Sequence, residues 1–213
     1  MSFFSKLFKR KPKAGEVGWR VGGIEDFMTL IRVYYQSLMA STLGITNLAA
    51  LPDLRMFKQT LKVPTAGNRL GVSEKNKSRK MLIDIYGLSE DFFKEIDASV
   101  KKRCRNMQAM QRYLYQFQGF SQELMMLMGN LMKWKFRLPG FMKGTLRAMT
   151  ERTVRDVLTK DNWKDAGVRQ AVANVRQGQA TLGYSPEWMT EYVYNVVVLA
   201  KKEPKPTDTD EKK

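Results

Sequence analysis

The sequence predicts an all-α protein in which a single domain holds seven or eight helices. Apolar residues recur every three to four positions along most of its 213 residues, as they do on one face of an α-helix. Strand-type alternation is confined to residues 193–199, where the pattern also continues a helical face. Glycine followed by an apolar residue and a hydroxyl occurs at four corners, which is typical of a tight turn between helices.

Composition divides the chain into three segments. Residues 1–23 begin with apolar and basic side chains and continue with four glycines, which predicts a short amphipathic helix followed by a flexible linker. Residues 24–201 carry the helical periodicity and form the predicted domain, whose length is sufficient for a substantial core. Residues 202–213 consist of proline, threonine and charged residues, so we expect a disordered charged tail.

The first two helices follow from apolar spacing and from a helix-start signal. Residues 24–43 present one continuous apolar face, which predicts a helix over this range. Pro52 suits the first turn of a second helix, because proline lacks the N–H group that this turn leaves unpaired. Leu54, Phe57 and Leu61 are expected on the inner face of this helix.

The four corners define where several helices begin and end. In each of them glycine can adopt the left-handed conformation that ends a helix, and the hydroxyl can accept a hydrogen bond from the next helix. We therefore expect each hydroxyl residue to cap the helix that follows. The corners are Gly44-Ile45-Thr46, Gly71-Val72-Ser73, Gly87-Leu88-Ser89 and Gly183-Tyr184-Ser185.

The corner at Gly71 resembles, over about a dozen residues, the turn of a helix-turn-helix DNA-binding motif. In that motif the second helix needs apolar residues six and nine positions after the glycine. This chain has Lys77 and Lys80 at those positions. We therefore interpret the corner as ordinary helix capping.

The second half of the chain contains the longest predicted helix, residues 106–136. Its middle is apolar on nearly all sides, so the helix must be covered by others. Pro139 and Gly140 end it, Asp161 is expected to cap a later helix, and Ser185 is expected to open the last one. Eight of the fourteen methionines lie between Met107 and Met149, which favours a methionine-rich core over an adaptable partner groove.

The composition excludes many common enzyme classes. The chain has no histidine, which excludes Ser-His-Asp and Cys-His catalysis and metal sites built on imidazole. Its single cysteine, Cys104, cannot form an intramolecular disulfide, which is typical of a reducing compartment. No glycine-rich loop has the spacing of a phosphate-binding motif. We therefore expect a non-catalytic protein without a metal or cofactor.

The apolar runs are too short for a secretion signal or a membrane span. We therefore expect a cytoplasmic protein, with contact to the cytoplasmic face of a membrane as an option for its N-terminal segment.

Positive charge is the strongest functional signal in the sequence. The 37 lysines and arginines exceed the 21 acidic residues by sixteen, and the excess is concentrated in three clusters. Such clusters favour contacts with RNA or DNA phosphates, and Tyr115, Trp134 or Phe136 could stack on bases. The alternative is that the charge only maintains solubility. The candidate phosphate-binding residues are Arg69, Lys75, Lys77, Arg79, Lys80, Lys101, Lys102, Arg103, Lys133, Lys135 and Arg137.

The N-terminal segment supports a second hypothesis, a peripheral membrane or protein-docking adaptor. Residues 3–11 combine apolar side chains with basic ones, as in a helix that lies on an anionic lipid surface. The same composition also suits a helix that packs on its own domain or on a protein partner. The candidate docking residues are Phe3, Phe4, Lys6, Leu7, Phe8, Lys9 and Arg10. The sequence leaves the oligomeric state, the ligand and any base specificity open.

Overall fold

The structure is a computed structural model that describes residues 24–61, 71–132 and 143–199. These ranges hold eight α-helices and no strand, which confirms the predicted all-α fold. The predicted N-terminal segment and C-terminal tail lie outside the described residues. The helices are α2 (Ile24–Leu43), α3 (Pro52–Leu61), α4 (Val72–Tyr86), α5 (Glu90–Arg103), α6 (Met107–Leu131), α7 (Lys143–Thr159), α8 (Ala166–Leu182) and α9 (Pro186–Tyr192). A short 3-10 turn (Leu48–Ala50) precedes α3, and a π-helical turn (Val193–Leu199) continues α9.

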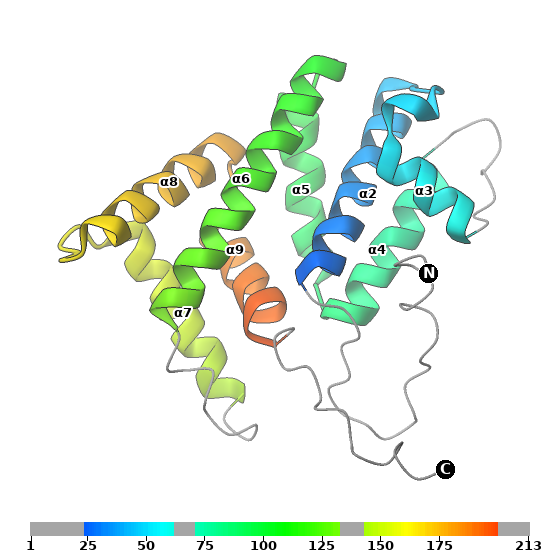
Figure 1. Ribbon diagram of the computed structural model, residues 1–213. Coiled ribbons are helices and arrows are strands. Elements are labelled where there is room, and N and C mark those ends of the chain that lie inside the picture. The colour runs from blue at the N-terminus through cyan, green and yellow to red at the C-terminus, as the bar shows by residue number, and fades with distance from the viewer. Residues whose placement is uncertain (1–23, 62–70, 133–142, 200–213) are drawn as a thin grey trace, which may run out of the picture.

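Two groups of helices flank a central set. α2 packs against α3 and α4 on one side, α7 and α8 lie on the other side, and α5, α6 and α9 lie between them (Figure 1). α6 packs along α8 and also contacts α2, so it connects the two groups. Its inner face is buried, as the apolar periodicity predicts, and includes Phe117, Leu124 and Leu127.

A stack of aromatic rings forms the centre of the core. The Trp188 ring is nearly parallel to those of Phe92 and Tyr184, with ring centroids 4.5 Å and 3.9 Å away. Tyr192 extends the stack at 5.4 Å from Trp188. The Trp188 indole also donates a hydrogen bond of 3.2 Å to the carbonyl of Phe92, so its polar N–H group is satisfied inside the core. The stack thus joins α5 to α9.

The methionine-rich core is present in part. Met110, Met128 and Met132 are buried, whereas Met126 is 68% exposed on the outer side of α6. Met142 lies outside the described residues.

The corner predictions hold at two of the four positions. Gly44, Gly71, Gly87 and Gly183 all have φ between 65° and 95°, the left-handed region that favours glycine. At the last two corners the hydroxyl is the cap, since Ser89 accepts from the Phe92 amide and Ser185 accepts from the Trp188 amide. The helix starts at these corners were therefore encoded locally.

The capping predictions for Thr46, Ser73 and Asp161 are wrong. Asn47, not Thr46, caps the 3-10 turn. Ser73 lies inside α4, because Gly71 is itself the N-cap and its amide donates to the Glu74 carboxylate at 2.9 Å.

Four residues further along the chain than the predicted Asp161, Asp165 caps α8 by accepting from the Val168 amide at 2.8 Å. Asp161 instead forms an ion pair of 2.6 Å with Arg176. In each case a residue nearer the actual start of the element serves as the cap: Asn47 for the 3-10 turn, Gly71 for α4 and Asp165 for α8.

The caps of α5 and α9 are connected to each other in a reciprocal way. Ser185 donates its amide and hydroxyl hydrogens to the carboxylate of Glu95 on α5, at 2.9 Å and 2.6 Å. Ser89 donates its amide and hydroxyl hydrogens to Glu191 on α9, with 2.7 Å for the hydroxyl. A glutamate of each helix therefore binds the capping serine of the other helix.

Candidate functional site

The basic cluster on α4 is largely neutralised by acidic neighbours. Lys75 pairs with Asp97 at 3.7 Å, and Lys80 pairs with Asp84 at 3.1 Å. Arg79 pairs with Glu90 and also lies over the Phe93 ring, 5.3 Å from its centroid. Lys77 is exposed. The α4 surface therefore presents much less free positive charge than its sequence indicates.

The cluster at the end of α5 has a different environment. Lys101 and Lys102 are exposed in the last turn of this helix, and Arg105 is exposed in the bend that leads to α6. Arg112 is exposed on the second turn of α6. We call Lys101, Lys102, Arg105 and Arg112 the basic corner.

The basic corner has no acidic residue of its own. Between Ala98 and Gln122 the chain contains five basic residues and no aspartate or glutamate. The sequence predictions included Lys101, Lys102 and Arg103 as candidates but missed Arg112. The absence of acidic residues over this stretch was the signal that would have found it.

Arg103 has a structural role beside the basic corner. Its Nε donates to the carbonyl of Thr181 at 2.7 Å, and one of its terminal nitrogens lies 3.3 Å from the Ser99 hydroxyl. The side chain thus connects the end of α5 to the end of α8. This contact fixes the position of the corner relative to α8.

A chain of buried hydroxyl groups continues inward from Ser99. Tyr113 donates to Ser99 at 2.9 Å, Tyr184 lies 2.8 Å from Tyr113, and Tyr35 lies 2.6 Å from Tyr184. Burial raises the pKa of Tyr35, Tyr113 and Tyr184 above the ordinary tyrosine value, so all three stay neutral at physiological pH. Burial also raises the pKa of the nearby Cys104 thiol to about 11. The tyrosine and cysteine side chains behind the corner are therefore uncharged.

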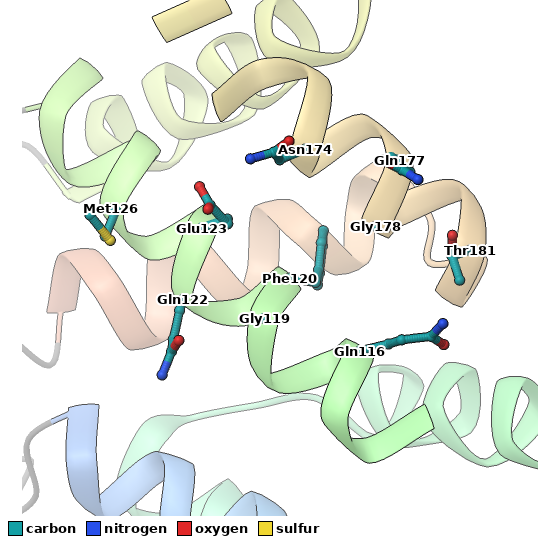
Figure 2. A pocket seen from close by; sticks show the side chains of 10 residues that line it. All are labelled: Gln116, Gly119, Phe120, Gln122, Glu123, Met126, Asn174, Gln177, Gly178 and Thr181. Carbon is teal, nitrogen blue, oxygen red and sulfur yellow. The ribbon is translucent and has the colours of Figure 1, made fainter. Parts of the chain in front are cut away.

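A groove runs between α6 and α8 (Figure 2). It lies next to the basic corner, because Thr181 in its lining accepts the hydrogen bond from Arg103. Its volume is about 370 Å³, which is within the range of small-ligand sites. Amide side chains dominate the lining, which also includes one carboxylate, Glu123, and one glycine on each helix. The lining residues are Gln116, Gly119, Phe120, Gln122, Glu123, Met126, Asn174, Gln177, Gly178 and Thr181.

The groove contrasts with the rest of this charged protein. Only two of the 25 residues of α6 are charged, Arg112 and Glu123. Two of the three large hydrophobic side chains that are exposed in the described residues lie on the outer side of α6, Tyr115 at 78% and Met126 at 68%. These features together form a weakly charged surface beside a strongly basic one.

Several predicted site residues lie outside the described ranges. They are Arg69, Lys133, Lys135, Arg137, Phe3, Phe4, Lys6, Leu7, Phe8, Lys9 and Arg10.

Within the described ranges, no helix is long and apolar enough to cross a membrane. In the same residues, no group of three or more aspartate, glutamate or cysteine side chains is placed to hold a metal ion.

Comparison with known proteins identifies the family of this chain. No curated protein and no solved structure matches it. The family model described as Domain of unknown function (DUF8491) matches residues 1–208, which is nearly the whole sequence. The chain therefore belongs to the DUF8491 family.

Proposed function

We propose that this protein is a non-catalytic binding protein that contacts the phosphates of RNA or DNA through the basic corner. The observation that carries this proposal is the contrast between the two described basic clusters. On α4 three of the four basic side chains are paired with carboxylates. At the corner the exposed basic side chains stand in a stretch of chain without acidic residues.

Tyr115 supports a single-stranded ligand. It lies three residues after Arg112, on the same side of α6, and 78% of its surface is exposed. Proteins that bind single strands combine basic side chains, which contact the backbone, with exposed aromatic rings on which bases stack. Arg112 and Tyr115 offer both groups within one turn of α6.

Charge reversal at the corner tests this proposal. We expect the protein to bind single-stranded RNA or DNA with Kd of about 10⁻⁴ to 10⁻⁶ M at physiological salt, and more tightly at low salt. The triple variant Lys101→Glu, Lys102→Glu, Arg105→Glu should lower the slope of log K against log salt by about three units, one for each lost phosphate contact. Fluorescence anisotropy of a labelled oligonucleotide at several salt concentrations measures this slope.

A matched control separates local contacts from net charge. Lys94→Glu, Arg152→Glu, Lys164→Glu changes the net charge by the same amount at exposed positions away from the corner. The control should retain most of the wild-type slope. Equal losses in both triple variants, or binding to anionic vesicles but to no nucleic acid, would overturn the proposal.

A further inference from the structure

The groove between α6 and α8 begins where the basic corner ends. Thr181 lines the groove, and its carbonyl accepts the hydrogen bond from Arg103 at the end of α5. Gln116, which lies at the same end of the groove as Thr181, follows Arg112 and Tyr115 on α6 (Figure 2). A polymer held at the corner would therefore run directly into the groove.

The groove offers almost no positive charge to phosphates. None of its lining residues is a lysine or arginine. The two arginines of α8 are directed toward the connection from α7, where Arg169 donates to the carbonyls of Trp163 and Lys164. Arg176 donates to the Val157 carbonyl at 2.8 Å, near the end of α7. Phosphate contacts are thus confined to the corner, and the groove presents amides and a carboxylate, the groups that recognise base edges.

Glu123 and Asn174 form a pair of opposite hydrogen-bonding character. Figure 2 shows them on α6 and α8, at the end of the groove away from Gln116 and Thr181. The Oδ1 atom of Asn174 accepts from Gln170 at 3.0 Å, which leaves its amide nitrogen as a donor. Glu123 has no ion-pair partner among the described residues, and its carboxylate can only accept.

A carboxylate that faces the exocyclic substituent of a base can distinguish bases that carry an amino group there from bases that do not. Cytosine, adenine and guanine each present an amino group that can donate to a carboxylate. Uracil presents a carbonyl oxygen where cytosine has its amino group, and a carboxylate repels that oxygen. Glu123, facing this position of the ring, would therefore favour cytosine over uracil, although the two rings have nearly the same size.

Gly119 leaves one position of the groove wall on α6 without a side chain. It is exposed in the middle of α6, and no described atom lies within 4 Å of the position that a Cβ atom would take. Glycine weakens an exposed helix interior relative to alanine, and packing does not require glycine at this position. Gly178, in contrast, is required by packing, because its Cβ would lie 2.7 Å from the ring of Phe120. A base in the groove can therefore approach the α6 backbone at Gly119 without displacing a side chain.

We propose that the α6–α8 groove binds unpaired bases of a single strand whose phosphates contact the basic corner, and that Glu123 selects bases with an exocyclic amino group. This inference rests on the proposed function and adds a ligand class to it. The path from Arg112 to Glu123 spans eleven residues of helix, about 17 Å, which is enough for several nucleotides.

Two oligoribonucleotides of the same length test the selection. We expect oligocytidylate of about 12 nucleotides to bind about five- to tenfold more tightly than oligouridylate. Glu123→Gln keeps the size of the side chain but adds a donor and removes the charge, so the ratio of the two affinities should fall toward one. Glu151→Gln is the matched control, because it makes the same charge change on an exposed residue of α7 and should leave the ratio unchanged.

The outcomes separate this inference from the proposed function. If both oligonucleotides bind equally to the wild-type protein with a steep salt dependence, the groove does not select bases, although the corner still binds phosphates. If neither oligonucleotide binds at low salt, the proposed function itself is wrong. An unchanged ratio in Glu123→Gln would also overturn the assignment of Glu123.

A second variant tests the groove without altering any hydrogen-bonding group. Gly119→Leu should fill the space beside α6 and reduce the affinity ratio of the two oligonucleotides, while the salt slope set by the corner stays the same. Gly144→Leu places the same side chain at an exposed glycine of α7 with open space around it, and should leave both quantities unchanged. Circular dichroism verifies that each variant keeps its helices. A wild-type ratio in folded Gly119→Leu would contradict the inference.

Discussion

All hydrogen bonds in the buried chain of Ser99, Tyr113, Tyr184 and Tyr35 are donated in the same direction along the chain. Ser99 donates its hydrogen to the carbonyl of Leu182, and Tyr113 donates to Ser99. Because each hydroxyl has one hydrogen, Tyr184 must donate to Tyr113, and Tyr35 must donate to Tyr184. The Leu182 carbonyl at the end of α8 thus orients hydroxyl groups from three other parts of the fold.

This direction predicts an order of stabilities among phenylalanine variants. Tyr113→Phe removes the acceptor for the Tyr184 hydroxyl hydrogen, which is then buried without an acceptor, and this should lower the free energy of unfolding by about 1–3 kcal/mol. Tyr35→Phe removes only the first donor and should cost less. Urea denaturation measures both, with the exposed Tyr115→Phe as a control expected within about 0.5 kcal/mol of wild type. Equal losses at positions 35 and 113 would refute the order.

At the scale of elements, α5 and α9 begin with the same local pattern. Residues 87–95 and 183–191 both read glycine, an apolar or aromatic residue, serine, any residue, an acid, an aromatic residue, two further residues and glutamate. The glutamate of each helix accepts from the capping serine of the other. The aromatic residues, Phe92 and Trp188, stack on each other between the two caps. The two helix starts are thus related by an approximate twofold arrangement.

A double-mutant cycle tests the coupling between these helices. Ser185→Ala removes an N-cap and a partner of Glu95, and should lower the free energy of unfolding by about 1–2 kcal/mol. Combined with Glu95→Ala, the loss should be smaller than the sum of the single losses by about 0.5–3 kcal/mol, because the two residues share one interaction. The pair Ser185→Ala with Arg55→Ala, an exposed position on α3, which packs on α2 and α4, should be additive. Additivity for Ser185 and Glu95 would show that their contact contributes nothing.

The whole molecule should lose stability at alkaline pH. Burial raises the pKa of Tyr35, Tyr113, Tyr184 and Tyr192, whereas the same tyrosines titrate near pH 10 in the unfolded chain. Below that pH both states are protonated and these residues cause no change. Above it the unfolded state loses protons that the folded state keeps, so stability falls as pH rises.

The expected slope is about 1.4 kcal/mol per pH unit for each tyrosine that ionises only in the unfolded state. Urea midpoints measured from about pH 8 to pH 11 give this slope. Tyr35→Phe should have a shallower slope, and the difference separates the tyrosine effect from the deprotonation of lysines. A stability that rises steadily over this range in the wild type, with the same slope in Tyr35→Phe, would contradict the prediction.

The sequence predicted the fold well because its determinants are local. Helical periodicity, Pro52 and the glycines of the corners each act within a few residues, and α3, α5 and α9 begin where these signals placed them. Charge neutralisation on α4 depends partly on other helices, since Asp97 and Glu90 belong to α5. Among the ion pairs that the basic side chains of α4 form with described residues, only that of Lys80 with Asp84 could be predicted from the sequence, because these residues lie four positions apart on one helix.

The groove was not predictable for the same physical reason. Its two walls are separated by about 50 residues of chain. The sequence of neither α6 nor α8 contains a motif that indicates that these two helices pack together. Gly119 was visible as a glycine in a long helix, but whether packing required it depended on its neighbours in space. The candidate site therefore needed tertiary structure, whereas the fold class did not.

The reciprocal caps also join residues that the ribosome synthesises at very different times. Ser89 and its partner Glu191 are 102 residues apart, so at ~5–20 residues per second the ribosome needs roughly 5–20 s to supply the second after the first. During that interval Phe92 has been synthesised without the Trp188 ring that covers it in the finished core. Until α9 has been synthesised, the Phe92 ring of α5 therefore lacks this part of its apolar cover.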